Sequence, residues 1–356
     1  MAGTMQTQNG RQLFVHLGAF PKFVHHYVTA AADVNPSYET ILITDQHLPI
    51  SDSYKTLLLD EIVSHEDRSK LHDLLTLSGF DHHFRNGYWE KIFTRFLALR
   101  AYAKKFPAEI PHIHLESDVY SWLTADLIAD IFNNKDETSP DSYIPVIDQN
   151  NACPSVILSK NSYALANVCD FVIQNINGPY GQTDMNILSG AINAGILSPL
   201  PTTVESSNIT IGIGADSQTE NQAFVVFDGA AIGQYLFGID PRNNKGLISP
   251  GYREIRGGFD PGLWTEWKVS ECADRVKRIS FVSEGLTGVC AVVHIHSKIT
   301  VGTEKFPLEQ FLDSANGKLQ TQQSFNVIAF SLYYLERLRW KIRGILKKFY
   351  SFLLLK

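Results

Sequence analysis

Two acidic side chains interrupt an apolar run at residues 112–120, which reads His-Ile-His-Leu-Glu-Ser-Asp-Val-Tyr. In a β-strand, residues two apart point to the same face, so Glu116 and Asp118 could both reach one ion. Carboxylate oxygens suit a hard divalent cation such as Mg²⁺ or Mn²⁺. The alternative is a strand-end acid pair that accepts hydrogen bonds from loop amides. Because charges inside an apolar strand are costly unless something pairs them, this stretch is the first candidate for a metal site.

A second candidate is a pair of histidines late in the chain. His294 and His296 close the β-branched run that begins at Val289, and the other ten histidines all lie before residue 115. An imidazole that joins two carboxylates makes a reasonable Mn²⁺ site, and Lys298 could then neutralise a phosphate held by the same ion. The alternative is a half-exposed strand whose histidines are satisfied by hydrogen bonds.

These groups need a framework, and the start of the chain indicates an α/β one. The run at residues 13–17, a helix-permitting stretch and the run at residues 40–44 predict strand, helix and strand. Short β-branched runs separated by a helical length pair in parallel through a right-handed crossover. Asp45 would then lie at the carboxyl edge of the sheet, where ligands bind.

A long amphipathic helix is predicted between this unit and the acid pair. Apolar residues recur at helical spacing over residues 88–105, and Pro107 and Pro111 end the pattern. The helix carries Arg95 and leads directly into the predicted strand at residues 112–120.

Composition excludes several classes of protein. The chain has 356 residues, of which 44% are hydrophobic and 19% charged, and its formal net charge is −6. This is a globular composition, and no apolar run is long enough to cross a bilayer. Four scattered cysteines favour a reducing compartment. Residues 1–11 are polar, lack the apolar stretch of a secretory signal and are expected to be disordered, so we predict a cytoplasmic protein.

The C-terminal segment, residues 325–356, has a charge bias of its own. Its last 20 residues hold seven cations and no acid, which leaves 24 cations against 37 acids in the rest of the chain. Apolar residues at three- and four-residue steps predict an amphipathic helix. A core or coiled-coil helix is one alternative, but the cations favour a basic helix on an anionic membrane surface.

Together, the opening strand-helix-strand unit, the helix with its Arg, the acid-x-acid motif and the late His near a Lys resemble the GT-A family of metal-dependent glycosyltransferases. The resemblance covers roughly residues 12–300, and it implies a GT-A-like domain over residues 12–320. The implied fold is α/β, with a mixed, mostly parallel sheet of Rossmann type flanked by helices and followed by the basic helix. In that family a DxD-type motif holds Mn²⁺ or Mg²⁺, and the metal holds the diphosphate of a nucleotide sugar.

The resemblance also implies roles for individual residues. Glu116 and Asp118 match the metal motif, His294 or His296 matches the C-terminal metal ligand, and Glu in place of Asp at the first position leaves open a ribose contact for Glu116. The remaining matches are to the donor nucleotide: the base and ribose pocket around Gly18, Pro21 and Asp45, and the phosphate contacts Arg95 and Lys298.

Two stretches in the middle of the chain combine turn glycines with an acid and amides, as a sugar site would. They centre on Asp184 and Asp228, of which Asp228 is the preferred candidate for a catalytic base, with Asp184 and Glu254 behind it. Asp before an apolar helical stretch is also a good N-cap. The cap alternative is equal for Asp228 and somewhat ahead for Asp184.

The expected function is the transfer of a sugar from a nucleotide diphosphate donor to a glycan or lipid-linked saccharide, with a UDP sugar as the expected donor. Surface polysaccharide synthesis at the inner face of the cell membrane would use such an enzyme, and no nucleic-acid partner is expected. The alternatives are a nucleotide-sugar nucleotidyltransferase or hydrolase, and a non-catalytic protein that binds glycans or membranes.

Overall fold

The computed structural model describes residues 9–85, 87–134, 139–148, 150–180, 183–214, 222–237 and 261–295. Its helices and strands are, in chain order, β1 (Gly10–His16), α1 (Lys22–Val34), β2 (Tyr38–Thr44), β3 (Lys55–Leu58), α2 (Leu59–Ile62), α3 (His65–Leu77), α4 (Tyr88–Lys105), β4 (His112–Leu115), β5 (Val119–Ser121), α5 (Ala125–Asn133), β6 (Ser142–Asp148), β7 (Asn151–Ala152), β8 (Val156–Ser159), α6 (Ser162–Gln174), α7 (Asp184–Asn193), β9 (Ser198–Leu200), β10 (Thr210–Gly212), β11 (Gln222–Phe227), α8 (Ala231–Phe237), the 3-10 helix η1 (Pro261–Leu263), β12 (Thr265–Glu271), β13 (Lys277–Ser283) and β14 (Leu286–His294).

The chain opens with the predicted strand-helix-strand unit. β1 and β2 pair in parallel from Gly10 opposite Tyr38 to His16 opposite Thr44, and α1 connects them. The long helix α4 has the predicted bounds, residues 88–105. One boundary is corrected, because β1 begins at Gly10, so Gly10 and Arg11 belong to the sheet and not to a disordered N-terminus.

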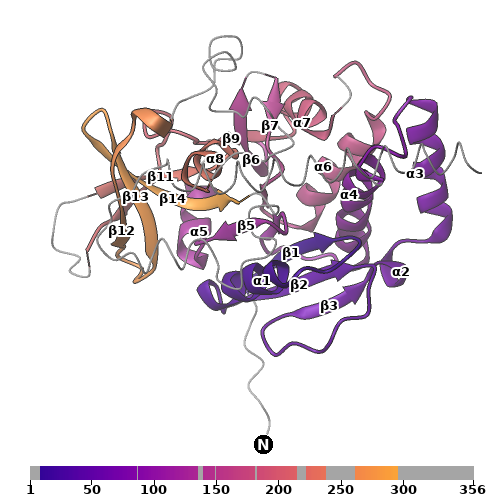
Figure 1. Ribbon diagram of the computed structural model, residues 1–356, viewed down its shortest axis with the longest axis horizontal. Coiled ribbons are helices and arrows are strands. Elements are labelled where there is room, and N and C mark those ends of the chain that lie inside the picture. The colour runs from indigo at the N-terminus through magenta and orange to yellow at the C-terminus, as the bar shows by residue number, and fades with distance from the viewer. Residues whose placement is uncertain are drawn as a thin grey trace, which may run out of the picture.

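The central sheet confirms the predicted α/β class. Its strand order is β3-β2-β1-β4-β8-β6-β7, with β9 beside β6. The pairs from β3 to β4 are parallel, and so is β6 with β9, whereas β8 and β7 run antiparallel to their neighbours. The sheet is therefore mixed and mostly parallel, with helices on both faces (Figure 1).

Alternation along β1 assigns each face of this sheet to a separate core. Phe14 faces one core, which contains the apolar side of α1, α5 and residues of the second sheet. Leu13 and Val15 face the other core, which contains α3, α4, α6 and α7. Burial of apolar area on both faces explains why β1 has almost no exposed side chain.

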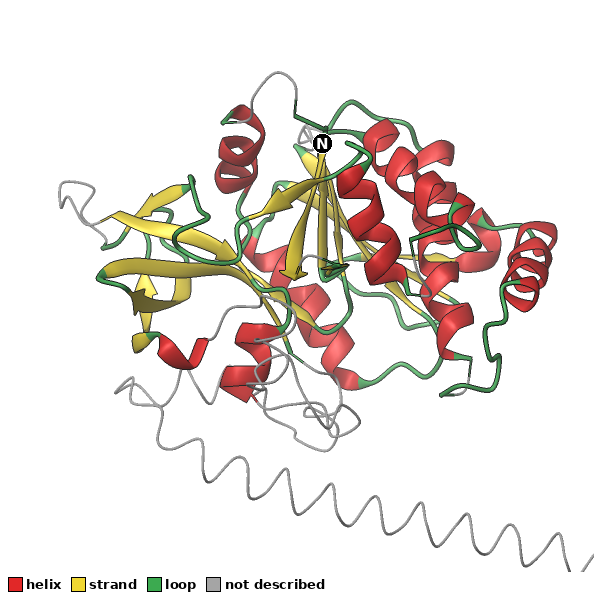
Figure 2. Cartoon of the chain, turned by 90° about the horizontal axis from the view of Figure 1, so that it is seen from above, coloured by secondary structure: helices red, strands yellow, loops and turns green. Residues whose placement is uncertain are grey.

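A second sheet lies at one end of the described molecule (Figures 1 and 2). Its order is β10-β11-β14-β13-β12, and β5 joins it by pairing with β14. Trp264, Trp267 and Phe281 pack in its core, where Trp264 stacks on Phe281 at 4.1 Å between ring centroids.

The predicted strand at residues 112–120 is wrong in one respect. Residues 112–115 form β4 in the central sheet, and residues 119–121 form β5 in the second sheet. Residues 116–118 form the turn between the two strands. Glu116 and Asp118 therefore do not share one face of a strand, and they lie where the chain passes from one sheet to the other.

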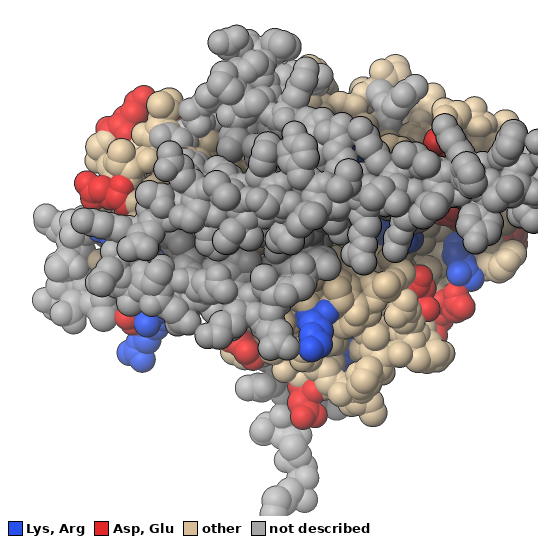
Figure 3. All heavy atoms as spheres, in the orientation of Figure 1, with Lys and Arg blue, Asp and Glu red and all other residues tan. Residues whose placement is uncertain are grey.

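Among the helices that the structure describes, none is both long and apolar enough to cross a membrane. Acidic and basic side chains are interspersed on the described part of the face seen in Figure 3. The predicted C-terminal helix at residues 325–356 lies outside the described residues.

Candidate functional site

The site lies at the carboxyl edge of the three parallel strands β1, β2 and β4. β1 ends at His16, β2 ends just before Asp45, and β4 ends just before Glu116. Parallel strands deliver the residues that follow them to one edge of a sheet, which is where α/β proteins bind ligands. Because β1 pairs in parallel with both β2 and β4, three residues at the ends of these strands lie at one edge of the sheet: His16, Asp45 and Glu116.

Pairing of β5 with β14 brings the late histidine to the acid pair. His294 lies opposite Val119 in this antiparallel pair, and Ile295 N donates to Asp118 O at 2.8 Å. Residues 176 positions apart in the sequence are therefore fixed by backbone hydrogen bonds. Side-chain spacing alone could not predict this contact.

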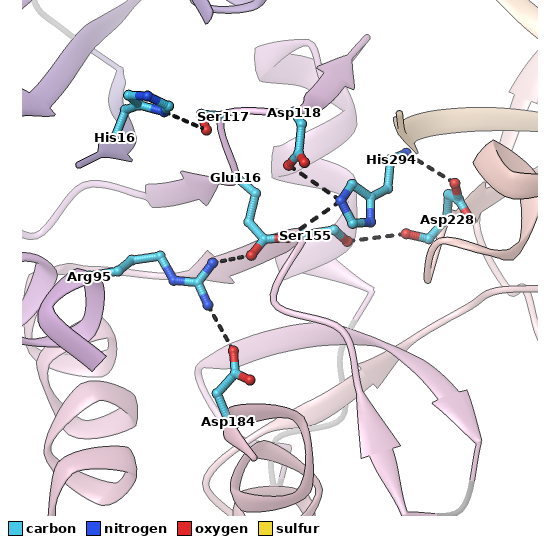
Figure 4. Close-up of polar contacts among 9 residues, drawn as sticks. All are labelled: His16, Arg95, Glu116, Ser117, Asp118, Ser155, Asp184, Asp228 and His294. Atoms are coloured by element: carbon cyan, nitrogen blue, oxygen red, sulfur yellow. Dashed lines mark hydrogen bonds and ion pairs between the residues drawn. The ribbon is translucent and has the colours of Figure 1, made fainter. Parts of the chain in front are cut away.

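Glu116, Asp118 and His294 form the central cluster of the site (Figure 4). His294 Nε2 lies 3.3 Å from Asp118 Oδ1 and 3.8 Å from Glu116 Oε2. One ligand atom from each residue lies within 4.8 Å of the others. Two carboxylate oxygens and one imidazole nitrogen at this separation could hold a divalent ion such as Mn²⁺. The structure brings the predicted acid pair together with His294, and the role of these residues as metal ligands stays a prediction.

Arg95, on α4, holds this cluster in place and is itself buried, with 6% of its surface exposed. Nη1 donates to Glu116 Oε1, and Nη2 donates to Asp184 Oδ2 at 2.9 Å. Burial works to lower the pKa of Arg95, but the two carboxylates outweigh it and raise that pKa. Arg95 therefore stays charged and aims the second oxygen of Glu116 at His294.

Charge also decides the protonation of His294. Burial alone would lower the pKa of its imidazole, yet the Asp118 carboxylate raises the pKa well above the ordinary 6.5. The imidazole then carries a positive charge at neutral pH. The carboxylates thus create a place for a cation between them.

A cavity of about 170 Å³ opens beside the cluster. Its lining is mixed in charge, with Glu116 and Asp118 opposed by Lys91 and Arg95. His16 also lines it, and its ring contacts Ser117 Oγ at 3.0 Å and Ala19 O at 2.8 Å. Burial lowers the pKa of His16, so this imidazole is neutral at pH 7. A negatively charged ligand with a bound cation would match this lining.

Of the predicted nucleotide contacts, Arg95 lines this cavity, whereas Gly18, Pro21 and Asp45 of the predicted base and ribose pocket do not. Gly18 N donates to both oxygens of Asp45, at 2.9 and 3.0 Å, so β1 and β2 are joined at their ends. Gly18 has a φ of +96°, which favours glycine, and a Cβ there would lie 3.0 Å from Lys91 Nζ. Pro21 occupies the N-cap position of α1.

Asp228 has the geometry of the cap alternative. It is fully buried, Oδ1 accepts from Ile232 N, and Oδ2 accepts from Gly233 N and from His294 N, at 2.9, 2.7 and 3.0 Å. A carboxylate saturated by three amides and shielded from solvent is poorly placed to accept a proton from an acceptor hydroxyl. Instead, Asp228 ties the first turn of α8 to the end of β14, which positions His294.

Asp184 is neither the expected cap nor an accessible base. Thr183 is the N-cap of α7, and its hydroxyl accepts from Asn186 N at 3.2 Å. Asp184 follows in the first turn, 5% exposed and paired with Arg95. Burial raises its pKa against the opposing effect of Arg95. Asp184 thus helps to hold the Arg95 guanidinium in place, and Arg95 in turn holds the Glu116 carboxylate.

Three candidate residues lie outside the described part of the chain: His296, Lys298 and Glu254. Two described residues, by contrast, line the cavity and were given no role from sequence. Lys91 precedes Arg95 by four positions on α4, a spacing that places both on one helix face. His16 ends the first strand, where the parallel-strand rule could have identified it.

Neither a protein-family description nor any curated protein matches this chain. Among solved structures, mouse xyloside xylosyltransferase 1 in its apo form is similar with a TM-score of 0.33 and 12% identity, over 54% of this chain and 84% of that chain. The PaToxG glycosyltransferase gives a TM-score of 0.32 and 14% identity, over 52% and 68%. An active-site mutant of the galactosyltransferase LgtC gives 0.35 and 10%, over 89% and 99%. At TM-scores below 0.5 these likenesses carry no argument, and function is derived from the site.

Proposed function

We propose that this chain is a metal-dependent glycosyltransferase whose donor is a nucleotide diphosphate sugar, with a UDP sugar as the expected donor. One observation carries the proposal: two carboxylates and an imidazole converge beside a cavity that is also lined by two cations. A divalent ion needs the first set of groups, and a diphosphate that bridges to that ion needs the second. The GT-A resemblance of the sequence supports the same assignment.

In this proposal Glu116, Asp118 and His294 hold Mn²⁺ or Mg²⁺. The donor set fits, because two carboxylate oxygens and one imidazole nitrogen suit Mn²⁺. The carboxylates raise the pKa of His294, so its imidazole would release a proton on binding the ion. Glu116 Oε1 is occupied by Arg95, so Oε2 is the oxygen that faces the ion. The metal when bound would act as a Lewis acid that stabilises charge on the departing diphosphate.

The chain's own residues would bind and orient the donor. Lys91 neutralises phosphate charge in the cavity, and Arg95 holds the Glu116 carboxylate so that Oε2 faces His294. During transfer the bond from the sugar's anomeric carbon to the diphosphate oxygen breaks, and a bond from that carbon to an acceptor oxygen forms. The acceptor hydroxyl passes its proton to the departing diphosphate, because neither Asp184 nor Asp228 is placed to take it.

The acceptor in this proposal is a glycan or lipid-linked saccharide at the inner face of the cell membrane, as surface polysaccharide synthesis would require. The seven cations within residues 337–356 support this location, because each basic residue near an anionic surface adds about 1 kcal/mol of attraction.

Thermal unfolding with and without Mn²⁺ and nucleotide sugars tests the function. A ligand that binds only the native state at 100 times its Kd stabilises it by roughly 2.7 kcal/mol. We expect a Mn²⁺-dependent rise in Tm with one nucleotide class, and its loss in Asp118→Asn. Asp130→Asn is the matched control, because Asp130 lies exposed on α5, away from the site.

Product analysis distinguishes the alternatives. Release of nucleoside diphosphate with a saccharide acceptor supports the glycosyltransferase. Release of nucleoside monophosphate with pyrophosphate would favour a nucleotidyltransferase, and metal binding without any turnover would favour a binding protein.

A further inference from the structure

A second group of side chains that could hold a metal ion lies where α3 and α4 meet. It consists of His72 on α3, His82 in the connection and Glu90 in the first turn of α4, with one ligand atom from each within 4.8 Å of the others. His72 Nδ1 lies 3.7 Å from Glu90 Oε1, and the two imidazole rings lie 4.3 Å apart. We propose that this cluster binds one Zn²⁺ ion.

The chemistry of the three groups favours Zn²⁺. Zinc sites are built from imidazole nitrogens and carboxylate oxygens, and two His with one Glu leave a fourth tetrahedral position for water. His72 is half exposed and Glu90 is 46% exposed, so an ion can enter from solvent. Nitrogen ligands distinguish this cluster from the oxygen-rich one at Glu116.

Thr76 prepares His82 for this role. The Thr76 hydroxyl donates its only proton to His72 O at 2.9 Å, and Thr76 Oγ1 also lies 2.8 Å from His82 Nε2. With its proton used, Thr76 must accept at the second contact, so His82 Nε2 carries the hydrogen. In that tautomer the lone pair lies on Nδ1, which would be the nitrogen that binds the ion. Hydrogen bonds of this kind to the second ring nitrogen commonly orient histidine ligands.

The connection that carries His82 is also held in place. Phe80 contacts Trp89 and Phe93 of α4, at 5.2 and 5.4 Å between ring centroids, and Phe84 stacks on Trp89 at 5.7 Å. These contacts fix the connection against the helix before any ion binds. A zinc ion would then join α3 to the first turn of α4, one residue before Lys91, and would hold the helix that lines the donor cavity.

Zinc binding by equilibrium dialysis tests the proposal, and the Asp118→Asn protein is the background because it disables the first cluster. We expect one equivalent of bound Zn²⁺ in this background and its loss on adding His82→Gln. Thr76→Val should weaken binding by about 10- to 100-fold. His65→Gln changes an exposed histidine on α3 outside the cluster and should leave binding unchanged.

Hydrogen exchange gives a second readout. Zn²⁺ should slow amide exchange over residues 78–85 and 87–90 in the Asp118→Asn protein and should not do so after His82→Gln. Equal zinc binding with and without His82→Gln, or no bound zinc in the Asp118→Asn background, would overturn the proposal. The exposed ligands allow these variants to fold, which far-ultraviolet circular dichroism checks. The outcome is independent of the glycosyltransferase proposal.

Discussion

Arg95 is the residue on which the charges of the site depend. It is the cation that neutralises two carboxylates, and one of them, Asp184, is almost fully buried. A buried ion pair contributes little net stability, but removal of one partner leaves the other charge uncompensated. Arg95 is therefore expected to determine both stability and the direction of Glu116.

We predict that Arg95→Met lowers the free energy of unfolding by about 3–5 kcal/mol, because Asp184 and Glu116 lose their common partner. Urea unfolding measures the change. Arg100→Met is the matched control on the same helix, since Arg100 pairs with Asp170 near the surface and should contribute less than about 1 kcal/mol.

The double variant Arg95→Met/Asp184→Asn separates this explanation from lost packing. Removal of the buried carboxylate together with its cation should recover roughly 1–3 kcal/mol of the loss. Strict additivity of the two single changes would contradict a direct coupling between them.

At the residue scale, the sequence predicts the types of groups at the site better than their partners. Glu116 and Asp118 were predicted to meet His294 or His296, because two carboxylates and an imidazole suit a Mn²⁺ ion, and the sequence left the choice between the two histidines open. Asp228 was equally compatible with a cap and a base, and the decision depends on amides of α8 and β14 that no local pattern connects. Burial and long-range hydrogen bonds therefore determine that Asp228 acts as a cap and not as a base.

At the scale of elements, a single glycine allows α8 to approach the end of β14. A Cβ on Gly233 would lie 1.8 Å from His294 O and 3.0 Å from Asp228 Oδ2. The backbone atom cannot move without shifting the strand that presents the His294 side chain. Close packing at this contact is thus connected to the geometry of the candidate metal cluster.

We predict that Gly233→Ala destabilises the protein by about 1–3 kcal/mol and weakens Mn²⁺ binding, because the strand end must move. Chemical unfolding and Mn²⁺ titration by calorimetry measure the two effects. Gly229→Ala is the control, since its Cβ would meet no atom closer than 3.3 Å. If the folded Gly233→Ala protein bound Mn²⁺ with undiminished affinity, the packing of α8 on β14 would have no effect on the metal site.

His112, the first residue of β4, should make the stability of the protein sensitive to acid. This histidine is fully buried, its Nδ1 donates to Ile110 O at 2.8 Å, and the Arg11 guanidinium lies 3.4 Å from Nε2. Burial, with a smaller contribution from Arg11, lowers its pKa from 6.5 to about 4. The native state therefore keeps the ring neutral where the unfolded chain takes up a proton.

Because the pKa of His112 is lower in the native state, its contribution to the free energy of unfolding is fully present above pH 6.5. That contribution is lost as pH falls toward about 4. We predict a slope of up to about 1.4 kcal/mol per pH unit from this one group. Urea unfolding at a series of pH values should show a shallower slope in His112→Gln. The slope of the exposed-site control, His65→Gln, should match that of the unchanged protein, and an equal slope in all three would exclude His112 as the source.

Elements with strong local patterns were predicted well, and those defined by pairing were not. The helix at residues 88–105 has the predicted bounds because its apolar spacing covers five turns. The acids at positions 116 and 118 interrupt the apolar run at residues 112–120, but no local pattern shows that its two halves join different sheets. That division results from the partners of each half, β1 and β8 for one and β14 for the other.

At the scale of the whole molecule, the site lies where the chain passes from the central sheet to the second sheet. β4 ends in the central sheet, β5 begins in the second, and β14 returns to place His294 against the turn between them. The acids thus come from the connection between sheets, and the imidazole comes from the second sheet. Separation of the two sheets would take His294 away from the acids, so both sheets must fold for the candidate metal site to form.

The charge of the whole molecule leads to the last prediction, since 13 more acids than cations in residues 1–336 are followed by seven cations in residues 337–356. We predict that the full chain floats with vesicles that contain anionic lipid and that a chain ending at Tyr334 does not. Attraction of about 1 kcal/mol per basic residue should weaken as salt is raised. Vesicles of neutral lipid are the control for insertion of apolar residues alone. Salt-independent flotation, or flotation of the shortened chain, would contradict an electrostatic anchor, and a change in oligomeric state without flotation would favour a helix that joins two copies.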